Sequence, residues 1–263
     1  MKNKQPLDDI RLFLLDMDGT FYLGEQLIEG SLDFIEKVRA SGREYLFLTN
    51  NSSHNADFYR RRLARMGLET DLKHILTSGE ATADLIKERY PGKKVFLLGN
   101  EFLREDFEQT GVCLSDTDAE LVVIGFDTSL TYERLRICCD YLRKGLPYIA
   151  SHPDFNCPTE TGFMPDIGAM IAFIDASVGR KPDLIVGKPY SGIVEAAKKR
   201  SGYATQEMAM VGDRLYTDIR TGLENNMLSI LVLSGETDED MLKSSPYQPD
   251  LCFNRLSEMI PLL

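Results

Sequence analysis

The chain has 263 residues, of which 43% are hydrophobic and 27% are charged. These values are typical of an ordinary globular protein with one large domain or two smaller ones. The net charge of −11 argues against a surface for nucleic acid or for an anionic membrane. It leaves room for a small anionic substrate, because a metal ion and a few basic groups can reverse the charge locally.

The cysteine pattern favours a reduced, cytoplasmic setting. There are five cysteines, an odd number, and none is spaced as Cys-x-x-Cys. The charged start of the chain has no apolar segment behind it, and no run is long enough to span a membrane. We therefore expect neither a signal peptide nor a membrane anchor.

Short apolar runs alternate with amphipathic helices along the chain, which predicts an α/β protein with a parallel sheet. Leu12–Leu15 has no polar face and predicts a strand covered on both sides. A small hairpin turn at Gly24–Gln26 and a helix capped by Ser31 follow. Further strands are expected at Tyr45–Leu48, Ile75–Thr77, Val95–Leu98, Leu121–Ile124, Tyr148–Ala150, Leu184–Val186, Met208–Val211 and Ser229–Leu233. Helices are expected at Ala81–Tyr90, Glu101–Thr110, Tyr132–Lys144 and Ile167–Ser177.

The domain organisation is predicted from the strand ends that carry polar side chains. These occur near both ends of the chain and are missing between about residues 80 and 180. We therefore predict a core domain of residues 1–79 and 181–263, interrupted by an inserted α/β domain of residues 80–180. The stretch Ser151–Asp166 contains three prolines and is expected to be a long irregular loop, which is usually functional.

Two aspartates follow the first strand directly. Residues two apart in an extended chain point to the same side, so Asp16 and Asp18 can share one site. In open parallel sheets, ligands bind outside the carboxyl ends of the strands, where this pair is expected. An aspartate can act as a nucleophile toward phosphorus, and a second carboxyl group can move the protons.

Three later strand ends carry matching chemistry: Thr49 with Asn50, Lys188, and Asp213 with Asp218. Clustered carboxylates repel one another, and a divalent cation resolves this repulsion. Mg²⁺ prefers oxygen ligands, so we expect it on Asp16 and Asp213, with the carbonyl or side chain of Asp18 as a third ligand. A metal, a lysine and a hydroxyl suit the charged oxygens of a phosphoryl group.

Each piece also has a simpler interpretation. Asp16 to Thr20 could be only a turn, and Thr49 to Ser52 only a loop before a helix cap. Lys188 could be a solvated lysine, and Asp213 could cap a turn. The order and placement of all four pieces favour the functional interpretation.

These residues resemble the motifs of the haloacid dehalogenase-like (HAD) hydrolase superfamily. Asp16-Met17-Asp18-Gly19-Thr20 matches its first motif, Thr49 the second, Lys188 in Gly-Lys-Pro the third, and Gly212-Asp213 through Asp218 the fourth. The sequence around Thr49 and around Asp213 is similar to that of the NagD-like or p-nitrophenyl-phosphatase branch. That branch places an α/β cap domain between the second and third motifs.

The resemblance implies a Rossmann-like HAD core and a role for each matched residue. It implies Asp16 as nucleophile, Asp18 as general acid and base, and Mg²⁺ on Asp16, Asp18 and Asp213. It implies phosphate binding by Thr49, Asn50, Asn51 and Lys188, with Asp218 supporting the metal and the lysine. The presence of Asp18 argues against a dehalogenase, since those relatives lack the second aspartate.

The predicted cap loop is the candidate for substrate selection. His152 and Asp154 could hydrogen-bond a substrate, and Phe155 could pack against it. The alternative is a loop held by its prolines, with Asp166 capping the next helix.

The resulting hypothesis is a Mg²⁺-dependent phosphatase acting on a small phosphorylated metabolite, with no nucleic-acid or membrane partner. The alternative from another class is a non-catalytic regulator that binds phosphate or metal. Asp18 favours the enzyme, because a protein that stores a phosphoryl group gains nothing from a group that speeds hydrolysis. The physiological substrate and the oligomeric state, including a homodimer through the cap, stay open.

Overall fold

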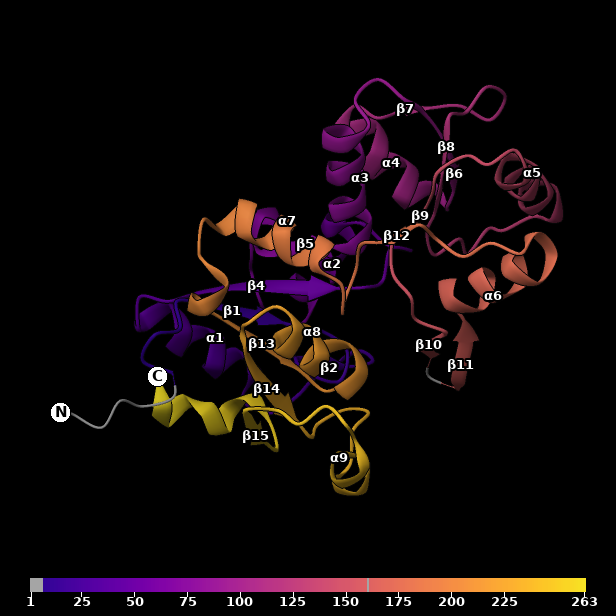
Figure 1. Ribbon diagram of the computed structural model, residues 1–263. Coiled ribbons are helices and arrows are strands. Elements are labelled where there is room, and N and C mark those ends of the chain that lie inside the picture. Colours follow the sequence, from indigo (N-terminus) through magenta and orange to yellow (C-terminus); the bar gives the residue numbers. More distant parts are fainter. Residues whose placement is uncertain (1–6, 160) are drawn as a thin grey trace. The chain divides into compact units, whose positions relative to one another are not determined.

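The computed structural model describes residues 7–159 and 161–263, which divide into two compact units (Figure 1). The first unit contains the described residues up to 48, together with 59–76 and 197–263. The second contains 49–58 and the described part of 77–196. The predicted core domain includes residues 49–58, 77–79 and 181–196, which belong to the second unit here. The division into a catalytic core and a cap domain stays a prediction. The prediction that there is no signal peptide was based on residues 1–6, which lie outside the described residues.

The first unit is built on a six-stranded sheet in the order β15-β14-β13-β1-β4-β5. The pairs β1–β13, β1–β4, β13–β14 and β14–β15 are all parallel. This confirms the predicted α/β fold class. The strands are β1 (Leu12–Leu15), β4 (Glu44–Thr49), β5 (Ile75–Thr77), β13 (Met208–Gly212), β14 (Leu228–Val232) and β15 (Leu251–Phe253), with a small hairpin of β2 (Tyr22–Leu23) and β3 (Gln26–Leu27).

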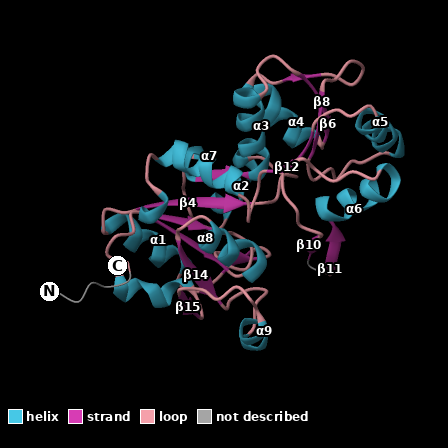
Figure 2. Ribbon diagram, viewed as in Figure 1, coloured by secondary structure: helices cyan, strands magenta, loops and turns pink. Residues whose placement is uncertain are grey.

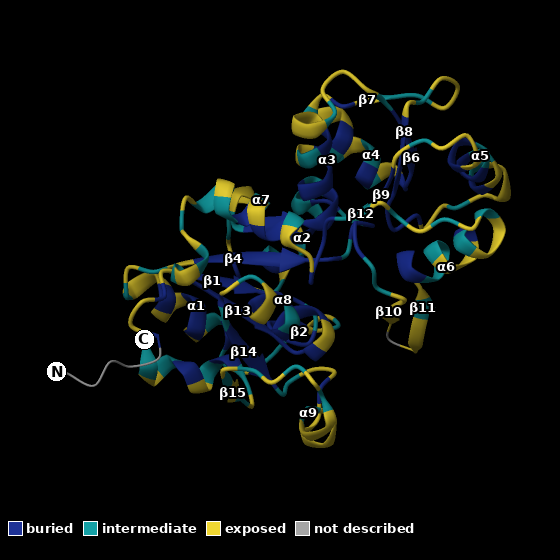
Figure 3. Ribbon diagram, in the orientation of Figure 1, coloured by how far each residue is buried: buried dark blue, intermediate teal, exposed yellow. Residues whose placement is uncertain are grey.

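β1 lies in the interior of this sheet because its side chains are apolar on both faces. All four of its residues are buried, as the sequence predicts for a strand with no polar face (Figure 3). Leu15 is in register with Val211 of β13 on one side and Phe47 of β4 on the other. The residues that follow β1 and β13 are therefore brought to the same edge of the sheet.

The second unit has a five-stranded sheet in the order β12-β9-β8-β6-β7, in which every neighbouring pair is parallel. Its apolar core combines residues of this sheet with the buried faces of α5 (Tyr132–Arg143) and α6 (Ile167–Val178). Both helices are labelled in Figure 2. The strands are β6 (Lys94–Leu98), β7 (Cys113–Leu114), β8 (Leu121–Ile124), β9 (Tyr148–Ala150) and β12 (Leu184–Ile185).

The α-helices are α1 (Ser31–Ala40), α2 (Ala56–Arg65), α3 (Ser78–Arg89), α4 (Glu101–Thr110), α5 (Tyr132–Arg143), α6 (Ile167–Val178), α7 (Ser191–Ser201), α8 (Arg220–Glu224) and α9 (Glu239–Ser244). The four helices predicted with bounds correspond to α3, α4, α5 and α6, with differences of up to three residues at the ends, and no helix was predicted at α8 or α9. None of the helices in the described part of the chain is long and apolar enough to cross a membrane.

Two local predictions are wrong. The hydroxyl of Ser31 does not cap α1; Gly30 occupies that position with φ of 78°, and Ser31 donates instead to the carbonyl of Phe21 at 2.9 Å. The stretch from 151 to 166 is not fully irregular, because β10 (Asn156–Thr159) and β11 (Gly162–Pro165) pair as an antiparallel hairpin. Each of these strands contains a proline, and neither shows the alternation of polar and apolar residues that predicts a strand.

Candidate active site

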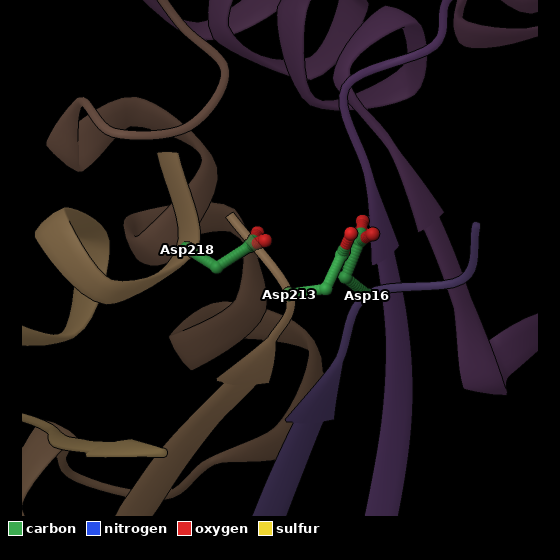
Figure 4. Close-up of side chains that lie close together, drawn as sticks. All are labelled: Asp16, Asp213 and Asp218. Atoms are coloured by element: carbon green, nitrogen blue, oxygen red, sulfur yellow. The ribbon is translucent and has the colours of Figure 1, made fainter. Parts of the chain in front are cut away.

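Three carboxylates gather where β1 and β13 end. Asp16 follows β1 and continues its ladder, since its N–H donates to the carbonyl of Val211 at 2.9 Å. Asp213 follows β13, and Asp218 lies in the short helical turn Leu215–Ile219. One oxygen from each of Asp16, Asp213 and Asp218 lies within 4.8 Å of the others (Figure 4). The parallel pairing thus joins groups almost two hundred residues apart.

Glycines allow the chain to approach these carboxylates closely. A side chain at Gly19, where φ is 83°, would overlap the carboxylate of Asp213, and one at Gly235 would do the same. A side chain at Gly212 would overlap the carboxylate of Asp218. The acidic group is therefore packed against backbone, which limits how far its oxygens can move apart.

Hydrogen bonds fix the orientation of two of the carboxylates. The Thr20 hydroxyl donates to one oxygen of Asp213 at 3.3 Å, and the N–H of Glu236 donates to the other at 2.7 Å. Asp218 accepts the N–H of Arg214 at 3.1 Å. Neutral donors orient the oxygens and offset only part of their charge.

The electrostatics of the group favour a bound cation. Burial raises the pKa of Asp213 to about 7, and the nearby charges of Asp16 and Asp218 act in the same direction. A divalent cation among these oxygens would replace repulsion by attraction. An all-oxygen donor set is the kind that Mg²⁺ prefers, so Asp16, Asp213 and Asp218 are suited to hold it.

The three clustered carboxylates differ at one residue, Asp18, from the three that are predicted to hold Mg²⁺. Its carboxylate is not among the clustered oxygens, whereas that of Asp218 is. The Asp18 carboxylate instead accepts the hydroxyl of Tyr22 at 3.3 Å. A role for the carbonyl or the side chain of Asp18 as a third metal ligand stays a prediction.

Asp18 has surroundings suited to proton transfer. Burial, together with the charge of Asp16, raises its pKa to about 6, while Arg62 and the Tyr22 hydroxyl oppose the shift. The Arg62 guanidinium lies 4.5 Å from the centre of the Tyr22 ring and donates to the carbonyl of Gly24 at 2.7 Å. A carboxyl group with this pKa can both give and accept a proton near neutral pH.

Two arginines near these carboxylates, Arg62 and Arg214, were not predicted from the sequence. Arg214 is half-buried and forms an ion pair with Glu236 at 2.9 Å. The charges of Asp16 and Asp213 raise its pKa further above the usual range, against the opposing effect of burial. The position of Arg214 directly after Asp213 in the sequence could have indicated that it lies near the acidic group. Nothing in the sequence near Arg62 or Tyr22 pointed to their contact.

The predicted phosphate-binding residues lie together in the second unit. Thr49, Asn50 and Lys188 are all buried, with 6%, 6% and 2% of their surfaces exposed. The Thr49 hydroxyl accepts the N–H of Asn51 at 3.1 Å, which shapes the loop after β4. The Asn51 carboxamide oxygen accepts the N–H and hydroxyl of Ser53 at 2.9 and 2.7 Å. The side chain of Asn51 thus also stabilises this loop.

Two of the three predicted cap-loop residues, His152 and Phe155, have different surroundings. His152 is fully buried, with Nε2 3.0 Å from Asp166 and Nδ1 3.3 Å from the hydroxyls of Ser78 and Ser151. Protein partners at both nitrogens favour an internal role for His152. The Asp166 side chain also accepts the N–H of Ile167 at 2.6 Å and caps α6. Phe155 is 61% exposed and stays a candidate for substrate contact.

Metal-free stability is expected to depend on pH through Asp213. Its proton is held more tightly in the folded state, where the pKa is about 7, than in the unfolded state, where it is about 3.9. This contribution is complete below about pH 4 and is lost as the pH rises through about 7. We expect the melting temperature in EDTA to fall by a few degrees between pH 5 and 7.5, and Mg²⁺ to reverse the fall.

The comparison variant for this prediction is Asp213→Asn. Asp106, in the second unit, also has its pKa raised to about 7, mainly by burial, and contributes with the same sign. The difference between wild type and variant isolates Asp213. Parallel curves in differential scanning fluorimetry would contradict the assignment.

Comparison with known proteins gives consistent matches over the chain. A family model described as haloacid dehalogenase-like hydrolase matches residues 13–113, and one described as HAD-hydrolase-like matches residues 185–259. The solved structure of a 4-nitrophenylphosphatase from Thermotoga maritima is 46% identical, with a TM-score of 0.95, and covers 97% of this chain and 98% of its own.

Two curated relatives carry names that differ in substrate. The acid sugar phosphatase of Staphylococcus aureus strain MRSA252 is 34% identical over 95% of this chain and 96% of its own length. The 5'-nucleotidase YutF of Bacillus subtilis is 32% identical over 95% of this chain and 98% of its own length. The four sequence motifs and these matches point to the same group of proteins.

Proposed function

This chain belongs to the haloacid dehalogenase-like hydrolase family, and from that membership we propose that it hydrolyses small phosphate monoesters with Mg²⁺ through an aspartyl-phosphate on Asp16. The observation that carries the proposal is the group of carboxylates at the ends of β1 and β13, with Asp18 held beside Tyr22. The predicted family and α/β fold class are confirmed. The names of the relatives support a phosphatase and leave its substrate open.

In the first step of the proposed reaction, an Asp16 oxygen attacks phosphorus and the bond from phosphorus to the leaving oxygen breaks. Asp18 gives its proton to that leaving oxygen. In the second step Asp18 takes a proton from water, whose oxygen attacks phosphorus and releases Asp16 with inorganic phosphate. Both carboxyl groups return to their starting protonation states, so the cycle balances.

The remaining residues bind and orient. Mg²⁺, when bound by Asp16, Asp213, Asp218 and the Asp18 carbonyl, supplies positive charge that stabilises the phosphoryl oxygens. Lys188 is proposed to bind a phosphate oxygen by its ammonium group, and Thr49 by its hydroxyl. The loop amides after Thr49 offer further donors. Arg214 offsets part of the negative charge that Asp16 and Asp213 leave in the first unit.

The assay that tests the proposal is phosphate release from p-nitrophenyl phosphate in the presence of Mg²⁺. We expect saturable turnover of this ester. Rates of phosphate release from a panel of sugar phosphates and nucleoside monophosphates would then rank the possible classes of natural substrate. Absence of phosphate release from every ester, with the protein folded and Mg²⁺ present, would contradict it. The cytoplasmic location and a homodimer remain further parts of the proposal.

Substrate preference is expected to depend on Phe155. The change Phe155→Ala removes an exposed ring from the predicted cap loop and leaves the buried acidic group untouched. We expect kcat/KM to fall about tenfold for the preferred metabolite and less than twofold for p-nitrophenyl phosphate. Tyr132→Ala, which removes another exposed ring of the second unit, is the control. Equal losses on all esters would argue against selection by this loop.

A further inference from the structure

The carboxamide of Asn50 is bonded at both ends to the backbone of one other residue, Lys188. Its nitrogen donates to the Lys188 carbonyl at 2.9 Å, and its oxygen accepts the Lys188 N–H at 2.7 Å. The two residues are 138 positions apart in the chain, and both are buried. Two simultaneous bonds from a planar group fix both the position and the orientation of that peptide segment.

The same carboxamide also reaches the predicted cap loop. Its nitrogen lies 3.2 and 3.1 Å from the two carboxylate oxygens of Asp154. A carboxamide has two N–H donors, so one serves the Lys188 carbonyl and the other serves Asp154. No N–H of the Asn50 side chain is then left for a phosphate oxygen.

A glycine makes this arrangement possible. A Cβ atom at Gly187 would lie 2.5 Å from the carboxamide oxygen of Asn50 and 2.7 Å from the carbonyl of Ser151. The N–H of Gly187 donates to that same carbonyl at 2.8 Å. The backbone before Lys188 is thus in contact with Asn50 on one side and the start of the loop on the other.

We propose that Asn50 is a positioning residue, whose carboxamide holds the backbone of Lys188 and connects it to Asp154, rather than a side chain that binds phosphate. This rests on the proposed function, in which Lys188 binds the phosphoryl group. The ammonium group of a lysine reaches its target from its own backbone, so a displaced backbone weakens phosphate binding. Because Asp154 belongs to the loop from 151 to 166, the connection links substrate selection to the phosphate-binding lysine.

The first measurement is competitive inhibition by inorganic phosphate, together with kcat and KM on p-nitrophenyl phosphate. Asn50→Ala is expected to raise the inhibition constant and KM about tenfold or more, and to lower kcat less. The matched control is Asn100→Ala. Asn100 is also a buried asparagine of the second unit, and its side chain bonds Ser53, Thr128 and the N–H of Leu103. It should lose comparable stability while its phosphate inhibition stays within twofold of wild type.

A second test exchanges the carboxamide and the carboxylate between positions 50 and 154. It remains informative even if the Asn50→Ala variant does not fold. Asn50→Asp places two carboxylates opposite each other and should weaken phosphate inhibition more than Asn50→Ala does. The double variant Asn50→Asp with Asp154→Asn restores an amide–carboxylate pair and leaves an acceptor for the Lys188 N–H. We expect it to recover at least about fivefold of the loss, a non-additivity that contacting residues show.

Lys188→Ala separates failure of this inference from failure of the proposed function. If Lys188→Ala leaves phosphate inhibition unchanged, the role of Lys188 is wrong. If Lys188→Ala weakens inhibition while Asn50→Ala behaves as wild type, the positioning role of Asn50 is overturned. A double variant no better than Asn50→Asp would overturn it as well, since a phosphate-binding side chain would gain nothing from a change at position 154.

Discussion

Replacing Asp16 by asparagine is expected to lower turnover of p-nitrophenyl phosphate by at least about a thousandfold, because the amide cannot attack phosphorus as the carboxylate does. The change is nearly isosteric, and Asp16 lies after β1 rather than in it. The substitution also removes a negative charge next to Asp213. That charge raises the pKa of Asp213 in the wild type. The metal-free variant should therefore be as stable as wild type at pH 7, or more so.

Circular dichroism and thermal unfolding of the variant test that last point, and kcat on p-nitrophenyl phosphate tests the first. Asp33→Asn is the matched control, since Asp33 is an exposed aspartate of α1 in the same unit. It should keep full activity. An Asp16→Asn variant that retains more than a few per cent of wild-type turnover would exclude Asp16 as the nucleophile.

Intact-mass measurement after acid quenching gives an independent test of the covalent step. Wild type mixed with p-nitrophenyl phosphate should show a phosphorylated fraction that Asp16→Asn lacks. Asp18→Asn should accumulate this species, because a good leaving group departs without a proton whereas water still needs a base. Faster loss of the phosphoryl group in Asp18→Asn than in wild type would contradict the role of Asp18.

Removing divalent metal with EDTA is expected to lower activity by at least about a hundredfold, and added Mg²⁺ should restore it. The reason is that the clustered carboxylates of Asp16, Asp213 and Asp218 would otherwise face a phosphate dianion with negative charge alone. Ca²⁺ should restore less, because it takes more ligands at longer distances than Mg²⁺. Steady-state rates after chelation and titration with each ion give the measurement.

Asp213→Asn provides the internal comparison for the metal requirement. It should raise the Mg²⁺ concentration for half-maximal activity about tenfold or more, since it removes one charged ligand while keeping the side-chain size. Unchanged activity in EDTA, with the metal content of the protein verified as zero, would contradict a metal-dependent reaction. An unchanged Mg²⁺ titration in Asp213→Asn would exclude that residue as a ligand.

The sequence by itself determined the strand that precedes Asp16 and the class of fold. Four consecutive apolar residues at Leu12–Leu15 have no solvent face, which favours the interior of a covered parallel sheet. Asp16 follows immediately, and parallel strands place their carboxyl ends at one edge. The apolar pattern of a strand and the position where it ends can be recognised from neighbouring residues in the sequence. For this reason the proximity of the Asp16 and Asp213 carboxylates could be predicted.

Only the tertiary structure decided which partner each polar side chain has. Asn50 and Lys188 are 138 residues apart, and no local pattern distinguishes a carboxamide that binds phosphate from one that holds a peptide backbone. His152 looked available for substrate, yet both of its ring nitrogens have buried protein partners. A hydrogen bond depends on tenths of an ångström and on angles. Those quantities are set by packing of the whole chain, whereas the order of apolar and polar residues sets only which elements form.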